Sequence, residues 1–139
     1  MTAHNFPIRI YYEDTDAGGV VYHASYVRFV ERARTELLRD LGYNHMQLLR
    51  EHKTGFVVRH MEIDFQRPAL LDDSLNIATT VTRMGGASFD MQQTITRDSD
   101  IIADIKVVLV CMNVETMSAV RVPDMIRNSL QETYEKEGK

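Results

Sequence analysis

The stretch from Tyr26 to Gly42, YVRFVERARTELLRDLG, decides the fold because it is the clearest helix in the chain. Apolar residues recur there at spacings of three and four, which is the period of an amphipathic helix. They are Tyr26, Val30, Ala33, Leu37 and Leu41, with Val27, Phe29 and Leu38 widening the stripe. Gly42 follows where a helix C-cap is expected. The sequence therefore predicts one long helix over 26–41 with a face to bury.

Strand-like alternation of apolar and polar residues lies on both sides of this helix. It occurs in PIRIYY (7–12), FVVRHMEIDFQRP (56–68), and the segments 75–81, 89–95 and 101–114. The connector YNHMQLLREH (43–52) has helical character, and a short helix is expected after Pro123. MGGA (84–87) and RDSD (97–100) are suited to tight hairpin turns.

These elements predict a single α+β domain over 1–139, with five antiparallel strands and one long helix across the concave face. Hairpin turns would make the later strands sequential neighbours. The last strand is apolar on both faces from Val107 to Met112, and such a strand needs cover on both sides. Because one helix covers only one face of a sheet, we expect another subunit to cover part of the other face, in a homo-oligomer.

Composition narrows the classes of function. The chain has 139 residues, a formal net charge of -4 and a pI near 5.7, and no cluster of Lys and Arg, so nucleic acid is not an expected partner. Its single cysteine, Cys111, lies in the apolar run KVVLVCM, which predicts a buried, inert thiol in a reducing compartment. No apolar run reaches the length of a membrane span and no signal peptide is recognisable, so a cytoplasmic location is expected.

The segment YYEDTDAGGVVYHASY (11–26) carries the chemistry that stands out. Asp14 and Asp16 form a D-x-D pair, a pattern that by itself favours a structural turn. However, Gly18 and Gly19 allow close approach by a ligand, and they lead to a helix start whose free N–H groups can hold an anion. A carboxylate beside such amides suits acyl transfer.

A metal site is the alternative use of the same residues. Glu13, Asp14, Asp16 and His23 are possible ligands, but an extended chain puts Asp14 and Asp16 on one side and Glu13 on the other. His23 would have to fold back across the glycines. We therefore predict no metal and no cofactor.

The run YYEDTDAGGVVYHASYVRFVERARTELLR (11–39) closely resembles the YbgC-type acyl-CoA thioesterases, which belong to the 4-hydroxybenzoyl-CoA thioesterase family of hotdog folds. GFVVRHMEIDFQRPALLDDSL (55–75) and LVCMN (109–113) resemble the later strands of the same group. The resemblance implies a five-stranded sheet wrapped around one central helix, and dimers that share active sites and often pair into homotetramers. It also implies hydrolysis of acyl-CoA to free acid and coenzyme A.

The family's catalytic residues fall on two positions of this chain. The second aspartate of DTD, Asp16, matches the catalytic carboxylate, either as nucleophile or as general base. His23 matches the residue whose backbone amide polarises the thioester carbonyl. Ser25 is the better helix N-cap by propensity, whereas the resemblance favours a helix entry about one turn earlier.

Substrate contacts are expected from residues around this pair. The candidates are Tyr12, Gly19, Val20, Tyr22, Tyr26 and Arg59. For the three tyrosines, packing in the core is favoured over lining the acyl pocket. Coenzyme A phosphates need cationic partners, for which Arg59, Arg67 and Arg83 are candidates. The hairpin RMGGASF (83–89) lacks the basic residues of the 4-hydroxybenzoyl branch, which leaves an acyl carrier protein as an alternative acyl donor.

Two other functions stay open at this stage. One is a hotdog dehydratase, for which only His23 is suitably placed. The other is a binding module for acyl carrier protein or phospholipid-synthesis enzymes at the inner membrane. The resemblance to YbgC-type proteins implies a link to the Tol-Pal envelope system, which keeps this function open. Glu31 and Arg32 are interpreted as an ordinary solvated pair on the polar face of the helix.

Overall fold

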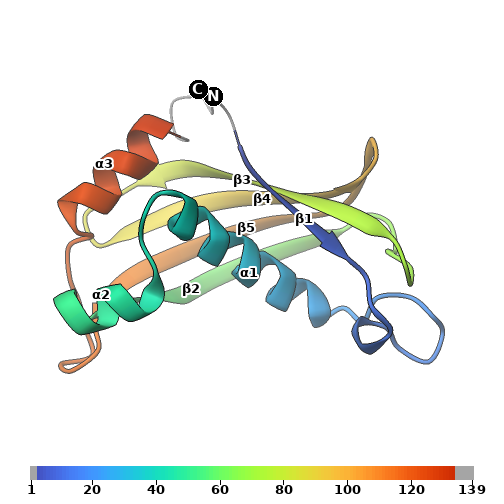
Figure 1. The fold of residues 1–139 in the computed structure, drawn as a ribbon, viewed down its shortest axis with the longest axis horizontal. Helices are drawn as coiled ribbons and strands as arrows, with labels where there is room; N and C mark the ends of the chain where they lie inside the picture. The colour runs from blue at the N-terminus through green and yellow to red at the C-terminus, as the bar shows by residue number, and fades with distance from the viewer. Residues whose placement is uncertain (1–2, 134–139) are drawn as a thin grey trace.

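The computed structural model describes residues 3–133, as a curled antiparallel sheet with one long helix along its concave face (Figure 1). The predicted α+β architecture is confirmed. Its elements are β1 (His4–Arg9), a 3-10 turn (Tyr12–Asp14), α1 (Ser25–Asp40), α2 (His45–His52), β2 (Thr54–Phe65), β3 (Ser74–Met84), β4 (Ser88–Arg97), β5 (Asp100–Asn113), β6 (Ser118–Ala119) and α3 (Asp124–Thr133).

The order of strands corrects one expectation. The sheet runs β1-β3-β4-β5-β2, and the two-residue β6 adds to β5. β3, β4 and β5 are sequential hairpin neighbours as predicted, but β2 pairs with β5 and not with β3. The segment 66–73 is no tight turn: the amides of Gln66 and Arg67 donate to Ile102, and Val21 donates to Ala69. It therefore carries the chain from the edge strand β2 across the molecule to β3, which lies between β1 and β4.

The apolar stripe of α1 joins the two halves of the core. Tyr26, Phe29, Val30 and Ala33 pack with Ile77, Ile95 and Ile105 of the sheet, whereas Leu37 and Leu38 pack with the side chains of β4, β5 and α3. The stripe follows the period read from the sequence because those positions share one helix face. α2 and α3 lie near the carboxyl end of α1, and the loop from β1 to α1 lies at its amino end (Figure 1).

The start of α1 agrees in part with each of the two predictions, a start at Ser25 and a start about one turn earlier. The helix begins at Ser25, but a turn precedes it, in which the amides of Ser25, Tyr26 and Val27 donate to carbonyls three residues earlier. Ser25 does not cap the helix, because it is the first helical residue after the N-cap Ala24; its Oγ donates to the Asp14 carbonyl and accepts Arg28 Nη2. The chain thus turns helically from Tyr22 onward.

β5 alternates between a fully buried and a half-buried face. Val107, Leu109 and Cys111 face the core, while Val108, Val110 and Met112 on the outer face stay partly accessible. The prediction of a buried thiol is confirmed, and burial raises the pKa of Cys111. In the described part of the chain, none of the helices has the length and apolar character to span a membrane.

Candidate active site

Asp14 anchors the loop that enters α1. The residue is 4% exposed, and its carboxylate accepts the Tyr11 amide at Oδ2 (2.9 Å) and Arg28 Nη2 at Oδ1 (3.1 Å). Its carbonyl accepts the Tyr22 amide (2.9 Å) and Ser25 Oγ (3.2 Å). Asp14 is therefore committed to structure. The expectation that it shares a side with Asp16 is wrong, because Tyr12–Asp14 forms a 3-10 turn and not an extended strand.

Asp16 has the opposite surroundings, because its side chain is exposed. The chain reverses directly after it: the Asp16 amide donates to Val20 (2.9 Å) and the Gly19 amide donates to the Asp16 carbonyl (3.2 Å). Gly19 has a φ of 85°, which a side chain would strain. Asp16 Oδ1 accepts the Gly18 amide (2.8 Å), while Oδ2 has no partner among residues 3–133. One carboxylate oxygen is fixed and the other is open.

The amides before α1 provide a site for a negative charge. Thr15 bridges to Val21, so the two arms of the loop lie side by side and the turn before α1 starts directly after the Val21 arm. The amides of His23 and Ala24 have no acceptor in the described chain, whereas their neighbours Tyr22 and Ser25 are bonded. Free amides at a helix start attract a developing oxyanion.

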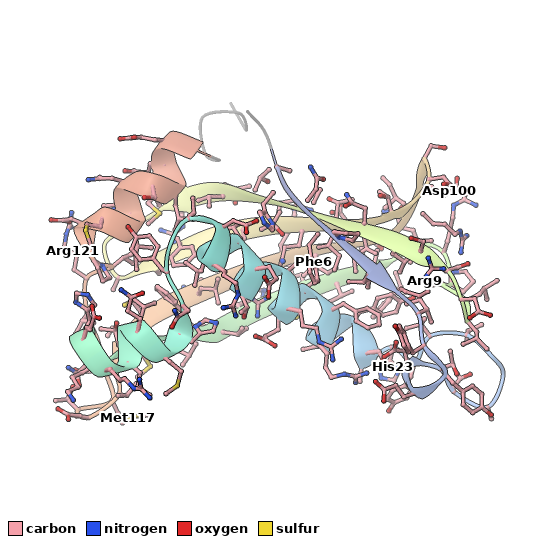
Figure 2. All side chains as sticks on the ribbon, in the orientation of Figure 1. Phe6, Arg9, His23, Asp100, Met117 and Arg121 are labelled. Atoms are coloured by element: carbon pink, nitrogen blue, oxygen red, sulfur yellow. The ribbon has the colours of Figure 1, made fainter. Side chains whose placement is uncertain are left out.

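His23 stands at the amino end of α1 (Figure 2), where its exposed ring lies 4.6 Å from the ring of Tyr22, measured between centroids. It lines a shallow pocket of about 260 Å³ with Val21, Tyr26, Phe65, Gln66, Arg67 and Pro68. Arg67 is thus the candidate arginine that shares this pocket with His23. Arg83 is instead bonded to Asp90 (2.9 Å) and Ser88 (2.8 Å) in its hairpin.

The remaining candidates fall into different environments. Tyr26 is buried, where its hydroxyl accepts the Ala69 amide (3.3 Å), and burial raises its pKa. Tyr12 is 82% exposed and Tyr22 is half exposed, so neither packs in the core of this chain, contrary to the packing expectation. Gly19 and Val20 belong to the loop itself, and Val20 bridges to Leu70.

Arg59 does not line the pocket that His23 and Phe65 share. It occupies the bulge of β2 between Val58 and His60, six strand residues before Phe65, which is roughly 20 Å along the strand. Over residues 3–133 no three His, Cys, Asp or Glu side chains gather as a metal site would need.

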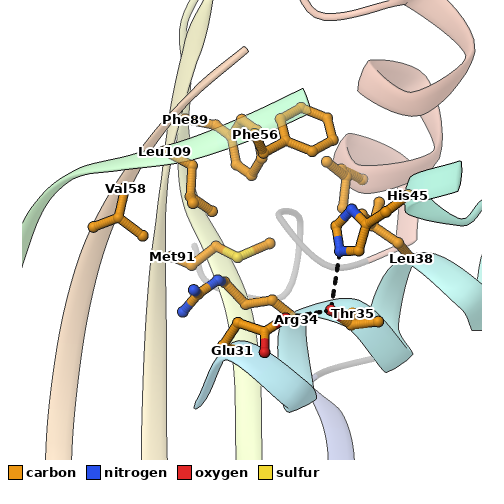
Figure 3. Close-up of a pocket in the computed structure, with 11 residues that line it drawn as sticks. Glu31, Arg34, Thr35, Leu38, His45, Phe56, Val58, Phe89, Met91 and Leu109 are labelled. Atoms are coloured by element: carbon orange, nitrogen blue, oxygen red, sulfur yellow. Dashed lines mark hydrogen bonds between the residues drawn. The ribbon is translucent and has the colours of Figure 1, made fainter. Parts of the chain in front are cut away.

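A second group of residues was not singled out by the sequence. Glu31, interpreted above as half of a solvated pair with Arg32, lies at a separate pocket, and its Oε2 accepts Thr35 Oγ1 (2.8 Å) (Figure 3). Arg34 and His45 line the same pocket. The helical spacing of residues 31, 34, 35 and 38 could have indicated that they share one face of α1. Polar residues at that spacing usually face solvent, however, so the spacing did not predict a pocket.

The fold and loop geometry define a thioesterase-like protein, and residues 11–130 match the Thioesterase-like superfamily. The chain belongs to this family. It is 42% identical to the acyl-CoA thioesterase YbgC of Haemophilus influenzae, over 88% of this chain and 90% of the relative. It is 44% identical to the acyl-CoA thioester hydrolase YbgC of Escherichia coli O157:H7, over 90% and 93%. A probable thioesterase from Bartonella henselae superposes with a TM-score of 0.84 at 43% identity, covering 88% of this chain and all of that one. The resemblance to YbgC-type hotdog thioesterases is confirmed.

Proposed function

We propose that the protein hydrolyses acyl-CoA thioesters, with Asp16 as the catalytic carboxylate and the His23 amide as the oxyanion donor. The observation that carries this proposal is the open Oδ2 of Asp16 on a loop that leads into two unbonded helix-start amides. The names of the two YbgC relatives point to the same reaction.

The reaction needs little beyond these groups. A thioester carbonyl is already electrophilic, so a positioned carboxylate and fixed dipoles at the developing oxyanion suffice. The Gly18 amide holds Oδ1 and thereby orients the carboxylate, leaving Oδ2 to act. Losing one oxyanion donor typically raises the barrier by about 3 kcal/mol.

Asp16 can act in two ways, as a general base or as a nucleophile. As a general base, it takes a proton from water while the oxygen of that water attacks the carbonyl carbon. Collapse of the tetrahedral intermediate breaks the C–S bond, and the proton passes to the coenzyme A thiolate. As a nucleophile, Oδ2 forms a mixed anhydride and expels the thiolate, and water then hydrolyses the anhydride.

The working unit proposed is a homo-oligomer built on the free edge of β2. On one side β2 pairs with β5, and along its length Val57, Val58 and Phe65 are each more than 40% exposed. An unpaired strand of twelve residues with exposed apolar side chains toward both ends calls for a partner strand, and pairing of two copies of β2 about a twofold axis would continue the sheet. Arg59, on the same edge, would then serve the site of the partner subunit.

Arg67 is the proposed cation for coenzyme A in the same chain, because it shares the shallow pocket with His23. Acyl carrier protein remains the alternative acyl donor. A cytoplasmic location is proposed from the single cysteine, which is buried and lacks a disulfide partner.

Steady-state hydrolysis of short, medium, long and aromatic acyl-CoAs tests the proposal, with release of free coenzyme A as the readout. Turnover of at least one ester is expected. If no ester is turned over by a folded oligomer, hydrolysis of acyl-CoA is contradicted, and acyl carrier protein esters or a binding role should be tested next.

A further inference from the structure

The pocket beside the carboxyl half of α1 has apolar walls and one polar end (Figure 3). Its walls are formed by Leu38, Phe56, Phe89, Met91 and Leu109, and the rings of Phe56 and Phe89 meet edge to face, 5.5 Å apart. The volume is about 100 Å³, less than the roughly 150 Å³ of a cavity that holds benzene. It can therefore enclose only a few heavy atoms of a larger ligand.

Arg34 provides fixed hydrogen-bond donors at the polar end. Its Nη1 donates to Oε1 of Gln93 (3.0 Å), and Gln93 is completely buried, donating to the Val30 carbonyl (3.0 Å) and Thr79 Oγ1 (3.1 Å). The other guanidinium N–H groups have no partner in residues 3–133, and no carboxylate of that range lies within 4.0 Å. Burial lowers the pKa of Arg34, so its charge is partly stripped of water.

Glu31, an exposed residue, provides an acceptor beside these donors (Figure 3). Its Oε2 accepts the Thr35 hydroxyl proton (2.8 Å), so His45 Nε2, 2.9 Å from Thr35 Oγ1, must be the donor in that bond. These two hydrogen bonds orient Glu31, whose Oε1 has no bonded partner in the described residues. A carboxylate ligand would be repelled by Glu31, and an ammonium ligand by Arg34. A hydroxyl both accepts and donates, so it satisfies the two groups together.

One face of α1 leads from the candidate active site at its amino end to this pocket. Ala24, Val27, Glu31, Thr35 and Leu38 follow one another at helical spacing, and Val27 leaves an exposed apolar side chain between the two ends. From Ser25 to Glu31 the helix rises roughly 9 Å, a distance that a medium-length acyl group spans.

We propose that this pocket receives the far end of the acyl group and selects acyl groups that carry a hydroxyl there, with Arg34 donating to the hydroxyl oxygen and Glu31 accepting from it. This inference rests on the proposed function, since it names the substrate class of the same enzyme. Arg34 and Glu31 are specificity-determining residues in this account, held in place by Gln93 and Thr35.

The test compares kcat/KM for hexanoyl-, octanoyl- and decanoyl-CoA with that for their ω-hydroxy counterparts, using the full chain. At the length that fits, the hydroxy ester should be favoured about ten-fold or more, as expected for a hydrogen bond to a charged group. Arg34→Met should abolish that ratio, whereas Arg39→Met, the same change at an exposed position of the same helix, should retain it.

Because Arg34→Met leaves Gln93 without its donor and could fail to fold, Glu31→Leu serves as a second variant that does not touch Gln93. It should also reduce the ratio. Equal rates for hydroxy and plain esters at every length, or a ratio unchanged in Glu31→Leu, would overturn the inference alone. Failure to hydrolyse either kind of ester would instead overturn the proposed function.

Discussion

Asp14 and Asp16 lie two residues apart and have opposite environments. Asp14 is buried and bonded through both carboxylate oxygens, to the Tyr11 amide and to Arg28, whereas Asp16 is exposed with Oδ2 open. The 3-10 turn over Tyr12–Asp14 directs the first carboxylate inward, and the turn after Asp16 leaves the second outside. The first carboxylate therefore positions the loop, and the second is available for chemistry.

Replacing Asp14 by Ala should destabilise the protein by about 2–4 kcal/mol, because the Tyr11 amide loses its acceptor and Arg28 keeps only its hydrogen bond to Ser25 Oγ. Urea unfolding followed by circular dichroism measures this. Glu13→Ala, an exposed neighbour, should stay within about 0.5 kcal/mol of the wild type. Equal stabilities for the two variants would refute the anchoring role.

Gly19→Ala should cost about 1–2 kcal/mol in stability, because a φ of 85° is strained for any residue with a Cβ. The same substitution at Gly86 meets no atom within 4 Å and needs no positive φ, so it is the matched control. Thermal unfolding of the two variants measures the difference in stability between them. If Gly86→Ala proved as damaging as Gly19→Ala, the loop conformation described here would be wrong.

Stability should fall as the pH rises through 10.0, the ordinary pKa of tyrosine, because burial raises the pKa of Tyr26. Above that pH the unfolded chain loses the phenol proton while the folded chain retains it, so unfolding is favoured by up to about 1.4 kcal/mol per pH unit. Tyr26→Phe should weaken this dependence and cost about 1 kcal/mol at neutral pH through the lost Ala69 bond. Urea midpoints on either side of pH 10.0 measure both effects, and an unchanged slope in Tyr26→Phe would contradict the assignment.

Val57→Asp should dissociate the proposed oligomer, since it puts a charge on the exposed apolar edge of β2. Light scattering after size-exclusion chromatography reads the mass directly. Met125→Asp makes the same kind of change at an exposed position of α3 and should leave the mass unaltered. A wild-type mass of one chain would rule out the interface altogether.

Local periodicity predicted most of the fold. The stripe of α1, the helical connector and the strands β2 to β5 were readable, because each depends on residues close in sequence. The strand predicted over 7–12 overlaps β1 only at 7–9, and β6 was not predicted. The pairing of β2 with β5 was not, since alternation identifies a strand without naming its neighbour. The hairpin rule then gave the wrong partner, because segment 66–73 crosses the molecule.

The candidate site was predicted unevenly for similar reasons. The sequence singled out Asp16 and the helix start. However, the assumption that residues 13–16 form an extended backbone put Asp14 on the same side as Asp16. Arg34 was not singled out, because its partner Gln93 is far away in sequence. Only the folded sheet brings that buried amide to α1.

The most direct test of the central claim is kcat/KM for the best acyl-CoA in the wild type, Asp16→Asn and the control Glu13→Gln. If Asp16 is the catalytic carboxylate, Asp16→Asn should lose about a hundred-fold or more in a folded protein, and Glu13→Gln should keep near wild-type activity. A loss of about ten-fold or less in Asp16→Asn would contradict this expectation and exclude Asp16 as the catalytic carboxylate.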